Sequence, residues 1–99
     1  MKRIRIAEEA LNDLNEGFCF YEAQQNGLGD YFLKCLRTDI EGLLESRGTH
    51  RIIFRDYHGL LSQRFPLGIF YTCEGEEIAI WAIIDLRRDT DWIRQRLNR

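Results

Sequence analysis

Residues 64–88, RFPLGIFYTCEGEEIAIWAIIDLRR, constrain the fold more than any other segment, because they contain the densest apolar run and the only proline. Two runs rich in Ile, Phe, Tyr and Trp, Leu67–Cys73 and Glu77–Ile84, flank a short polar link that contains Gly75. Such a link between two such runs predicts a β-hairpin. Apolar residues occupy both faces of each run, as in strands at the middle of a sheet that is covered on at least one face.

Strict alternation along a strand assigns the side chains of this hairpin to two faces. In the first run, Phe70 is expected opposite a set of three: Ile69, Tyr71 and Cys73. In the second run, Trp81 and Ile83 are expected opposite a set of four: Ile78, Ile80, Ala82 and Ile84. Pro66, which cannot donate a backbone hydrogen bond, marks where the hairpin begins.

The N-terminal part of the chain changes from strand to helix periodicity. Lys2–Ile6 alternates basic and apolar residues, which is typical of a short edge strand protected by its charges. From Ala7 to about Gln25, apolar residues recur every three or four positions and predict an amphipathic helix. Gly17 in its interior indicates the close approach of a neighbouring element. The apolar stripe comprises Ala10 or Leu11, Leu14, Phe18 and Tyr21.

A second helix follows a turn at Asn26–Asp30, where glycine suits the end of one helix and Asp30 can cap the next. Two amphipathic helices joined by so short a link fold back on each other as an antiparallel hairpin. The apolar stripe of the second helix comprises Phe32, Leu36, Ile40, Leu43 and Leu44.

The remaining segments complete the expected fold. After a polar break at residues 46–49, a short irregular strand and then a clear one, Gly59–Phe65, lead into the hairpin. Beyond the hairpin, Asp89 or Thr90 is suited to cap a last helix that has Trp92 on its apolar side. The expected fold is α+β, in the order strand, helix, helix, three strands, helix. It is one domain, residues 1–99, with the helical hairpin packed on a small antiparallel sheet.

The charge of the chain is −2 overall, and it is unevenly distributed. Residues 7–49 hold three basic and nine acidic residues, whereas residues 50–99 hold eight basic and seven acidic ones. The chain as a whole is therefore not a polyanion binder, and its acidity is concentrated in the predicted helical hairpin. The acidic residues of the first helix are expected on its solvated side: Glu8, Glu9, Asp13 and Glu16.

Residue types that often carry metal or redox chemistry show no such pattern here. Cys19, Cys35 and Cys73 lie in apolar segments without metal-ligand spacing and are interpreted as reduced, buried thiols of a cytoplasmic protein. His50 and His58 are expected in surface loops, because no carboxylate or nucleophile is placed to orient them. No metal or cofactor is therefore expected. No membrane association is expected either, since no apolar run reaches the ~18 residues of a membrane span.

Four short motifs, in this order, resemble those of the RelE/ParE toxin superfamily, especially its ParE-like, plasmid-stabilisation branch. Asp85 and Leu67 depart from the family pattern, which has a histidine and an aromatic residue at these positions. The matching segments are Ala10–Leu14 with Phe20–Glu22, Gly27–Gly29, Arg64–Pro66 with Ile69–Tyr71, and Arg87–Asp89 with Trp92.

The resemblance implies a small antiparallel sheet crossed by a helical hairpin, and a cognate antitoxin whose extended C-terminal segment wraps the toxin. It also implies one of two activities, because ParE-like members inhibit DNA gyrase and RelE-like members cleave mRNA on the ribosome. We interpret the chain as a ParE-like toxin of a type II toxin–antitoxin system that binds gyrase. The alternatives are a ribosome-dependent mRNA endonuclease and a non-toxic interaction domain of the same fold.

Catalysis of RNA cleavage needs cations for the phosphate charge that develops in the transition state. The candidates are Arg64 at the end of one strand and Arg87 and Arg88 after another, provided that they converge at one corner of the sheet. The acidic composition argues against such a site, as does the lack of the lysine cluster and C-terminal tyrosine of RelE-like nucleases. The chain is therefore interpreted as a binding protein rather than an enzyme, and structural pairing of the arginines with carboxylates is the alternative role.

Binding of a partner requires exposed apolar surface. Two helices and a short third one are not expected to cover both faces of the sheet, so Tyr71, Trp81 and Trp92 are expected to remain partly exposed. With Arg87 and Arg88 they form the predicted partner-binding residues. The mildly basic C-terminal tail favours an acidic partner.

Overall fold

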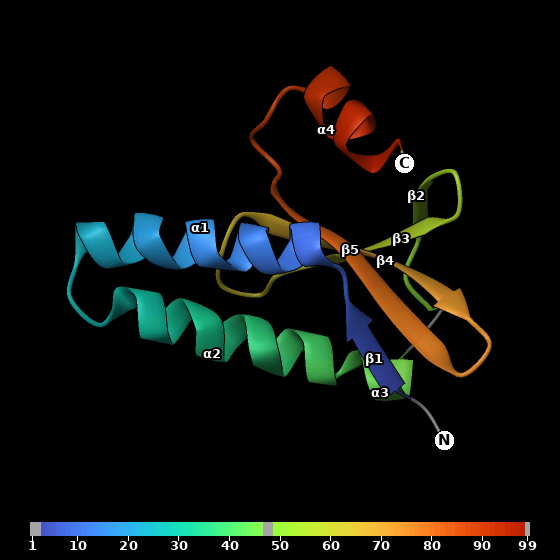
Figure 1. Ribbon diagram of the computed structural model, residues 1–99, viewed down its shortest axis with the longest axis horizontal. Coiled ribbons are helices and arrows are strands. Elements are labelled where there is room, and N and C mark those ends of the chain that lie inside the picture. The colour runs from blue at the N-terminus through green and yellow to red at the C-terminus, as the bar shows by residue number, and fades with distance from the viewer. Residues whose placement is uncertain (1–2, 47–48, 99) are drawn as a thin grey trace.

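A five-stranded sheet with helices on both faces forms the centre of the part that the structure, a computed structural model, describes, residues 3–46 and 49–98 (Figure 1). The strand order is β1-β5-β4-β3-β2. The strands are β1 (Arg3–Ile6), β2 (Ile52–Phe54), β3 (Tyr57–Leu61), β4 (Leu67–Glu74) and β5 (Glu77–Asp85). The helices are α1 (Glu8–Gln24), α2 (Leu28–Glu41), α3 (Leu43–Ser46) and α4 (Thr90–Leu97).

The sheet is mixed, because β1 runs parallel to β5 while the other neighbouring strands are antiparallel. The expectation of a wholly antiparallel sheet was therefore wrong. β1 and β5 are the first and the last strand in the sequence. No hairpin turn joins them, so the two strands are not forced to run antiparallel. Lys2, at the expected start of β1, and residues 47–48 of the polar break lie outside the described residues.

The strands before the hairpin differ from the prediction in number and extent. β2 is a fifth, edge strand with the irregular pairing that was expected of this segment. β3 ends at Leu61 and does not continue to Phe65. The chain turns here, since the Ser62 N–H donates to the carbonyl of Leu67 (2.9 Å) and the Leu67 N–H donates to that of Phe65 (2.7 Å).

Trp81 forms a β-bulge, because the ladder between β4 and β5 skips it. An extra residue in one strand reverses the alternation of the side chains that follow it. Ile83 consequently faces the helical hairpin, whereas Ala82 and Ile84 face α4. The strict alternation expected for this strand was wrong beyond Trp81. The bulge thus decides which face of the sheet each residue after Trp81 occupies.

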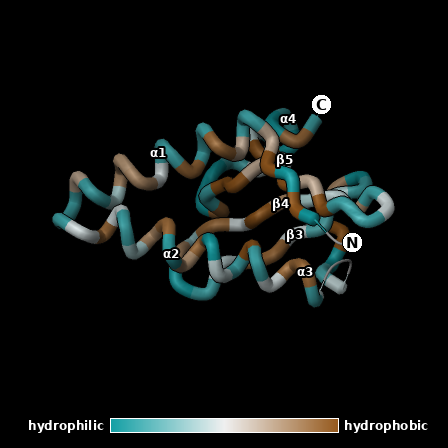
Figure 2. Tube along the Cα trace, turned by 60° about the horizontal axis from the view of Figure 1, so that its bottom comes forward, coloured by the Kyte–Doolittle hydropathy of each residue, from teal (hydrophilic) through white to brown (hydrophobic). Residues whose placement is uncertain are grey.

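Each face of the sheet has its own hydrophobic core, and Figure 2 shows the hydrophobic stretches of β4 and β5 at the centre of the molecule. Ala10 of α1 is fully buried and Leu11 is 47% exposed, so Ala10 is the residue that starts the buried stripe. The core under α1 and α2 includes Ala10, Phe32, Leu36, Ile40, Leu43, Ile69, Tyr71, Ile78, Ile80 and Ile83. The smaller core under α4 comprises Tyr57, Phe70, Ala82, Ile84 and Leu97.

A carboxylate closes the turn between α1 and α2. Glu22 accepts hydrogen bonds from the backbone N–H of Gly27 (3.0 Å) and from that of Gly29 (2.9 Å). Gly27, which precedes α2, has a φ of +88°, a conformation that glycine adopts without steric cost. Asp30 or a residue beside it was expected to cap α2. Gly27 precedes the helix instead, Asp30 lies in its first turn, and Glu22 of α1 accepts the hydrogen bonds.

Gly17 lets α1 and α2 approach closely, as its position in the sequence indicated. A Cβ atom at this position would lie 2.5 Å from Cζ of Phe32. Phe32 has no room to move away, because it is fully buried and its ring packs against Tyr21 and Phe65, with both centroid distances at 5.2 Å. The contact between the helices therefore depends on the missing side chain.

We expect Gly17→Ala to lower the free energy of unfolding by about 1–3 kcal/mol, because the added methyl group overpacks a filled core. Gly42→Ala is the matched control. Gly42 has helical φ (−62°), and the nearest atom to an added Cβ is 3.4 Å away, so this change is expected to be neutral or slightly stabilising. Urea denaturation followed by circular dichroism measures both variants, and equal stabilities would contradict the packing argument.

Candidate functional site

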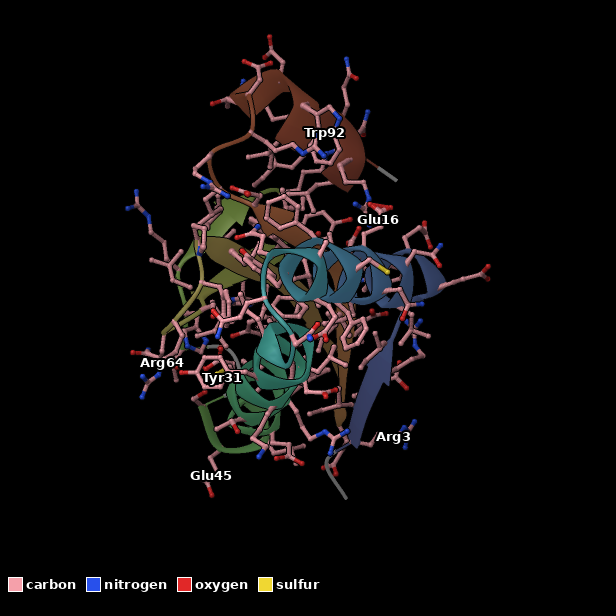
Figure 3. The ribbon with its side chains drawn as sticks, turned by 90° about the vertical axis from the view of Figure 1, so that its left-hand side faces the viewer. Arg3, Glu16, Tyr31, Glu45, Arg64 and Trp92 are labelled. Atoms are coloured by element: carbon pink, nitrogen blue, oxygen red, sulfur yellow. The ribbon has the colours of Figure 1, made fainter. Side chains whose placement is uncertain are left out.

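A cleft of about 770 Å³ lies between α1, the end of β5 and α4. α1 contributes Phe20 and Tyr21, the segment after β5 contributes Arg87 and Arg88, and α4 contributes Trp92. Phe20 is 56% exposed and Trp92 is 37% exposed, so the aromatic walls of the cleft are open to solvent. In Figure 3, Trp92 lies on the side of the molecule where α4 stands above α1.

Asp13 of α1 joins the three elements that form the cleft. Its Oδ2 accepts a hydrogen bond from the Ile83 N–H (2.9 Å), at a part of the β5 edge that lies beyond the end of β1. Both of its oxygens bind the guanidinium of Arg96 on α4, at 2.8 and 2.6 Å. This contact raises the pKa of Arg96 further. Asp13 was expected on the solvated side of α1, and that expectation was wrong.

Arg87 is held by Asp85 through its side chain and its backbone. Its Nε donates to Oδ1 (3.0 Å) and its Nη2 to Oδ2 (2.6 Å). Its backbone N–H also donates to Oδ1 (2.8 Å). These hydrogen bonds lower the pKa of Asp85, so the carboxylate stays ionised at neutral pH. The structural pairing that was the alternative for the arginines applies to Arg87.

Arg88 differs from its neighbour, because it stacks on an aromatic ring. Its guanidinium carbon lies 4.1 Å from the ring centroid of Trp92, which is the geometry of a cation–π contact. Among the described residues, no carboxylate lies within ion-pair distance of Arg88. Its positive charge acts on Asp85 at longer range and helps to lower the pKa of that carboxyl, but it is not held in an ion pair.

Carboxylates outnumber cations in the lining of the cleft. Tyr21 adds a neutral hydroxyl, and burial raises the pKa of this phenol further above physiological pH. The ionised groups are three arginines, Arg87, Arg88 and Arg96, and four carboxylates, Asp13, Glu16, Asp85 and Asp89, for a formal charge of −1. A site for a phosphodiester needs an excess of positive charge. The cleft is instead suited to an apolar side chain that carries a polar group beside it.

The structure brings together only some of the residues predicted for the site. Arg87, Arg88 and Trp92 meet in the cleft. Arg64 lies in a second hollow of about 560 Å³, between α2 and the β3–β4 turn, and Figure 3 shows it beside Tyr31 and far from Trp92. The three candidate cations for catalysis therefore do not converge at one corner of the sheet.

Tyr71 and Trp81 do not line the cleft. Tyr71 is fully buried under the helices, so its expected exposure was wrong. Its hydroxyl lies 2.7 Å from Nδ1 of His50, and its ring stacks on that of His58 at a centroid distance of 5.0 Å. Both histidines were expected in surface loops, but they are half-buried against this ring. Trp81 is half-buried too, and its Nε1 donates to the hydroxyl of Thr72 (2.9 Å).

The side chains that commonly bind metals do not form a metal centre in the described part of the chain, and its three cysteines are not fully buried. No group of three or more His, Cys, Asp or Glu side chains among residues 3–46 and 49–98 is placed to hold a metal ion. Cys35 and Cys73 are half-buried, whereas Cys19 is exposed, which corrects its expected burial. No helix in the described ranges is both long and apolar enough to cross a membrane.

Sequence analysis missed Asp13, Phe20 and Arg96 as parts of the site. For Asp13 a signal was present, because it lies three residues after the buried Ala10 and four before Gly17, on the same face of the helix. For Phe20 and Arg96 there was none. Their place in the cleft depends on how α4 returns toward α1.

Comparison with known proteins gives one informative result. No family model and no curated protein matches the sequence. Among solved structures, a chain described as "Chromosomal ParDE TA system from P. aeruginosa" is similar, with a TM-score of 0.72 and 18% sequence identity. The match covers 86% of this chain and 96% of that chain. The chain has a ParE/RelE-like fold. This agrees with the fold that the sequence motifs implied and does not separate the two branches.

We expect Asp13→Ala to lower the free energy of unfolding by about 2–3 kcal/mol, because it leaves the Ile83 N–H and the partly buried Arg96 without their acceptor. Arg96→Ala should cost less, since Asp13 keeps its bond to Ile83. Asn12→Ala, an exposed neighbour on the same helix, serves as the control and should change little. Chemical denaturation measures all three, and an Asp13→Ala protein as stable as the control would contradict the bridging role.

Proposed function

We propose that this chain is the toxin of a type II toxin–antitoxin pair, that a cognate antitoxin neutralises it in the cytoplasm, and that it acts by binding DNA gyrase. The observation that carries the proposal is the fold similarity to a chain of a ParDE system over most of both chains. The sequence motifs at Arg64–Pro66 and Arg87–Asp89, which resemble the ParE-like branch, give independent support.

Action by binding, rather than by RNA cleavage, is supported by the state of the arginines. Arg87 and Arg96 are each bound by an internal carboxylate, and Arg64 lies in a different hollow. A ribonuclease needs cations that converge on the scissile phosphate. With a formal charge of −1, the cleft also lacks the attraction for RNA that such an enzyme requires.

The cleft is the site that we assign to the antitoxin. It combines open aromatic walls, Phe20 and Trp92, with a polar rim, which is the composition of protein-binding surfaces. It is formed by elements from both ends of the chain, so a segment bound there would hold α1, β5 and α4 together. Arg87 and Arg88 remain the predicted contact residues, with Arg87 held in place by Asp85.

Expression of the chain without its partner should arrest growth, and DNA-damage signalling should rise if gyrase is the target. Co-expression of the protein encoded by the adjoining open reading frame should restore growth. Colony counts and a damage-responsive reporter measure these outcomes. Normal growth at verified expression of folded protein would contradict a toxic function. Loss of translation with cleaved mRNA and no damage signal would show that the target is mRNA and not gyrase.

We expect Trp92→Ala to weaken antitoxin binding by about 2 kcal/mol or more, as for aromatic anchors at the centre of interfaces. The matched control is Leu61→Ala. Leu61 is 58% exposed and lies outside the cleft, so its truncation should leave the affinity unchanged. Isothermal titration calorimetry with the folded variants gives both values. Equal affinities for Trp92→Ala and wild type would show that the antitoxin binds outside the cleft.

A further inference from the structure

Of the three arginines in the cleft, only Arg88 is not paired with a carboxylate of the described residues. The guanidinium of Arg96 is held by both oxygens of Asp13, and that of Arg87 by both oxygens of Asp85. Arg88 lies within ion-pair distance of no carboxylate in the described ranges, and its recorded contact is with the ring of Trp92. The cleft therefore contains one cation that is free to bind an external anion.

The contact with Trp92 holds this cation ready without occupying its donors. The guanidinium carbon is 4.1 Å from the ring centroid. A cation–π contact acts through the charge of the guanidinium and does not pair its N–H groups with a carboxylate. The guanidinium edge can bind a carboxylate through two parallel hydrogen bonds. Because the ring limits the motion of Arg88, less side-chain entropy is lost when a ligand binds.

The surroundings of Arg88 restrict the ligand further. The aromatic walls beside it, Phe20 and Trp92, are partly exposed and can enclose a bulky apolar side chain. Glu16 and Asp89 also line the cleft, and neither forms an ion pair with a described residue. These carboxylates repel an extended chain of negative charge, such as a nucleic-acid backbone. A single carboxylate beside an apolar group matches Arg88 and the aromatic walls, and it brings less negative charge near Glu16 and Asp89 than a nucleic-acid backbone does.

We propose that the cleft binds a polypeptide segment in which an Asp or Glu lies next to a bulky apolar residue. The carboxylate accepts two hydrogen bonds from the guanidinium edge of Arg88, and the apolar side chain packs between Phe20 and Trp92. This deepens the proposed function, on which the identity of the partner as an antitoxin rests. The chemistry of the cleft itself rests on the geometry of Arg88 and its neighbours.

The test uses an array of synthetic peptides and the purified full-length chain. Each peptide carries a Phe or Leu, and the adjacent position is Glu, Gln or Lys in otherwise identical sequences. We expect the wild-type chain to retain the Glu peptides about tenfold better than their Gln partners, the effect of one charge-assisted hydrogen-bonded pair. Lys peptides should bind more weakly still.

Arg88→Ala should abolish the preference for Glu over Gln, and Arg88→Lys should keep only part of it, because lysine lacks the planar fork. The matched control is Arg94→Ala, an exposed arginine of α4 that does not line the cleft, and it should keep the full preference. Circular dichroism confirms that each variant is folded. No preference in the wild type, or one that persists in Arg88→Ala, would overturn the inference. Binding of a single-stranded RNA oligonucleotide that depends on Arg88 would also overturn it.

The growth assay separates this inference from the proposed function. Arrest and rescue by the antitoxin, without any preference for Glu peptides, would leave the function standing and overturn the chemistry of the cleft. A preference that depends on Arg88, without arrest or an antitoxin, would uphold the chemistry and overturn the function.

Discussion

The arrangement around the cleft depends on the hydrogen bonds and the ion pair that the carboxylate of Asp13 forms. It occupies the β5 edge where β1 has ended, by accepting the Ile83 N–H, and it fixes α4 through both of its bonds to Arg96. The side chains of Asp13 and Arg96 are only 12% and 21% exposed, so the ion pair is little screened by water. A single residue thus replaces a missing sheet partner and attaches the last helix to the first.

The bulge at Trp81 decides which residues of β5 the last helix covers. By reversing the alternation of β5, it places Ala82 and Ile84 on the face that the helical hairpin leaves uncovered. Leu97 of α4 is buried against them, so a short helix completes the second core. The cleft is the space that remains between this helix and α1. The packing of α4 on this face therefore sets one wall of the cleft.

Internal pairing decides what the arginines of the cleft can do. Arg87 and Arg96 are each paired with an internal carboxylate, whereas Arg88 lies over an aromatic ring and is paired with no carboxylate of the described residues. Of the arginines that line the cleft, Arg88 is therefore the one whose charge is left without such a partner. This favours recognition of a protein segment over chemistry on a phosphate, which needs several cations at one point.

The sequence by itself determined the elements, because their apolar periodicity and glycine positions act locally: two helices folded as a hairpin, a central β-hairpin and a last helix. It also placed the start of that helix at Asp89 or Thr90, although the side chain of Asp89 makes no capping hydrogen bond. The sequence also named Arg88 and Trp92 as candidate site residues, and both line the cleft. Tertiary structure alone decided the parallel pairing of β1, the bulge at Trp81, the burial of Tyr71 and the bridging role of Asp13. Each of these depends on contacts between residues far apart in the chain, and no local pattern specifies which distant strand edge or charge will be adjacent after folding.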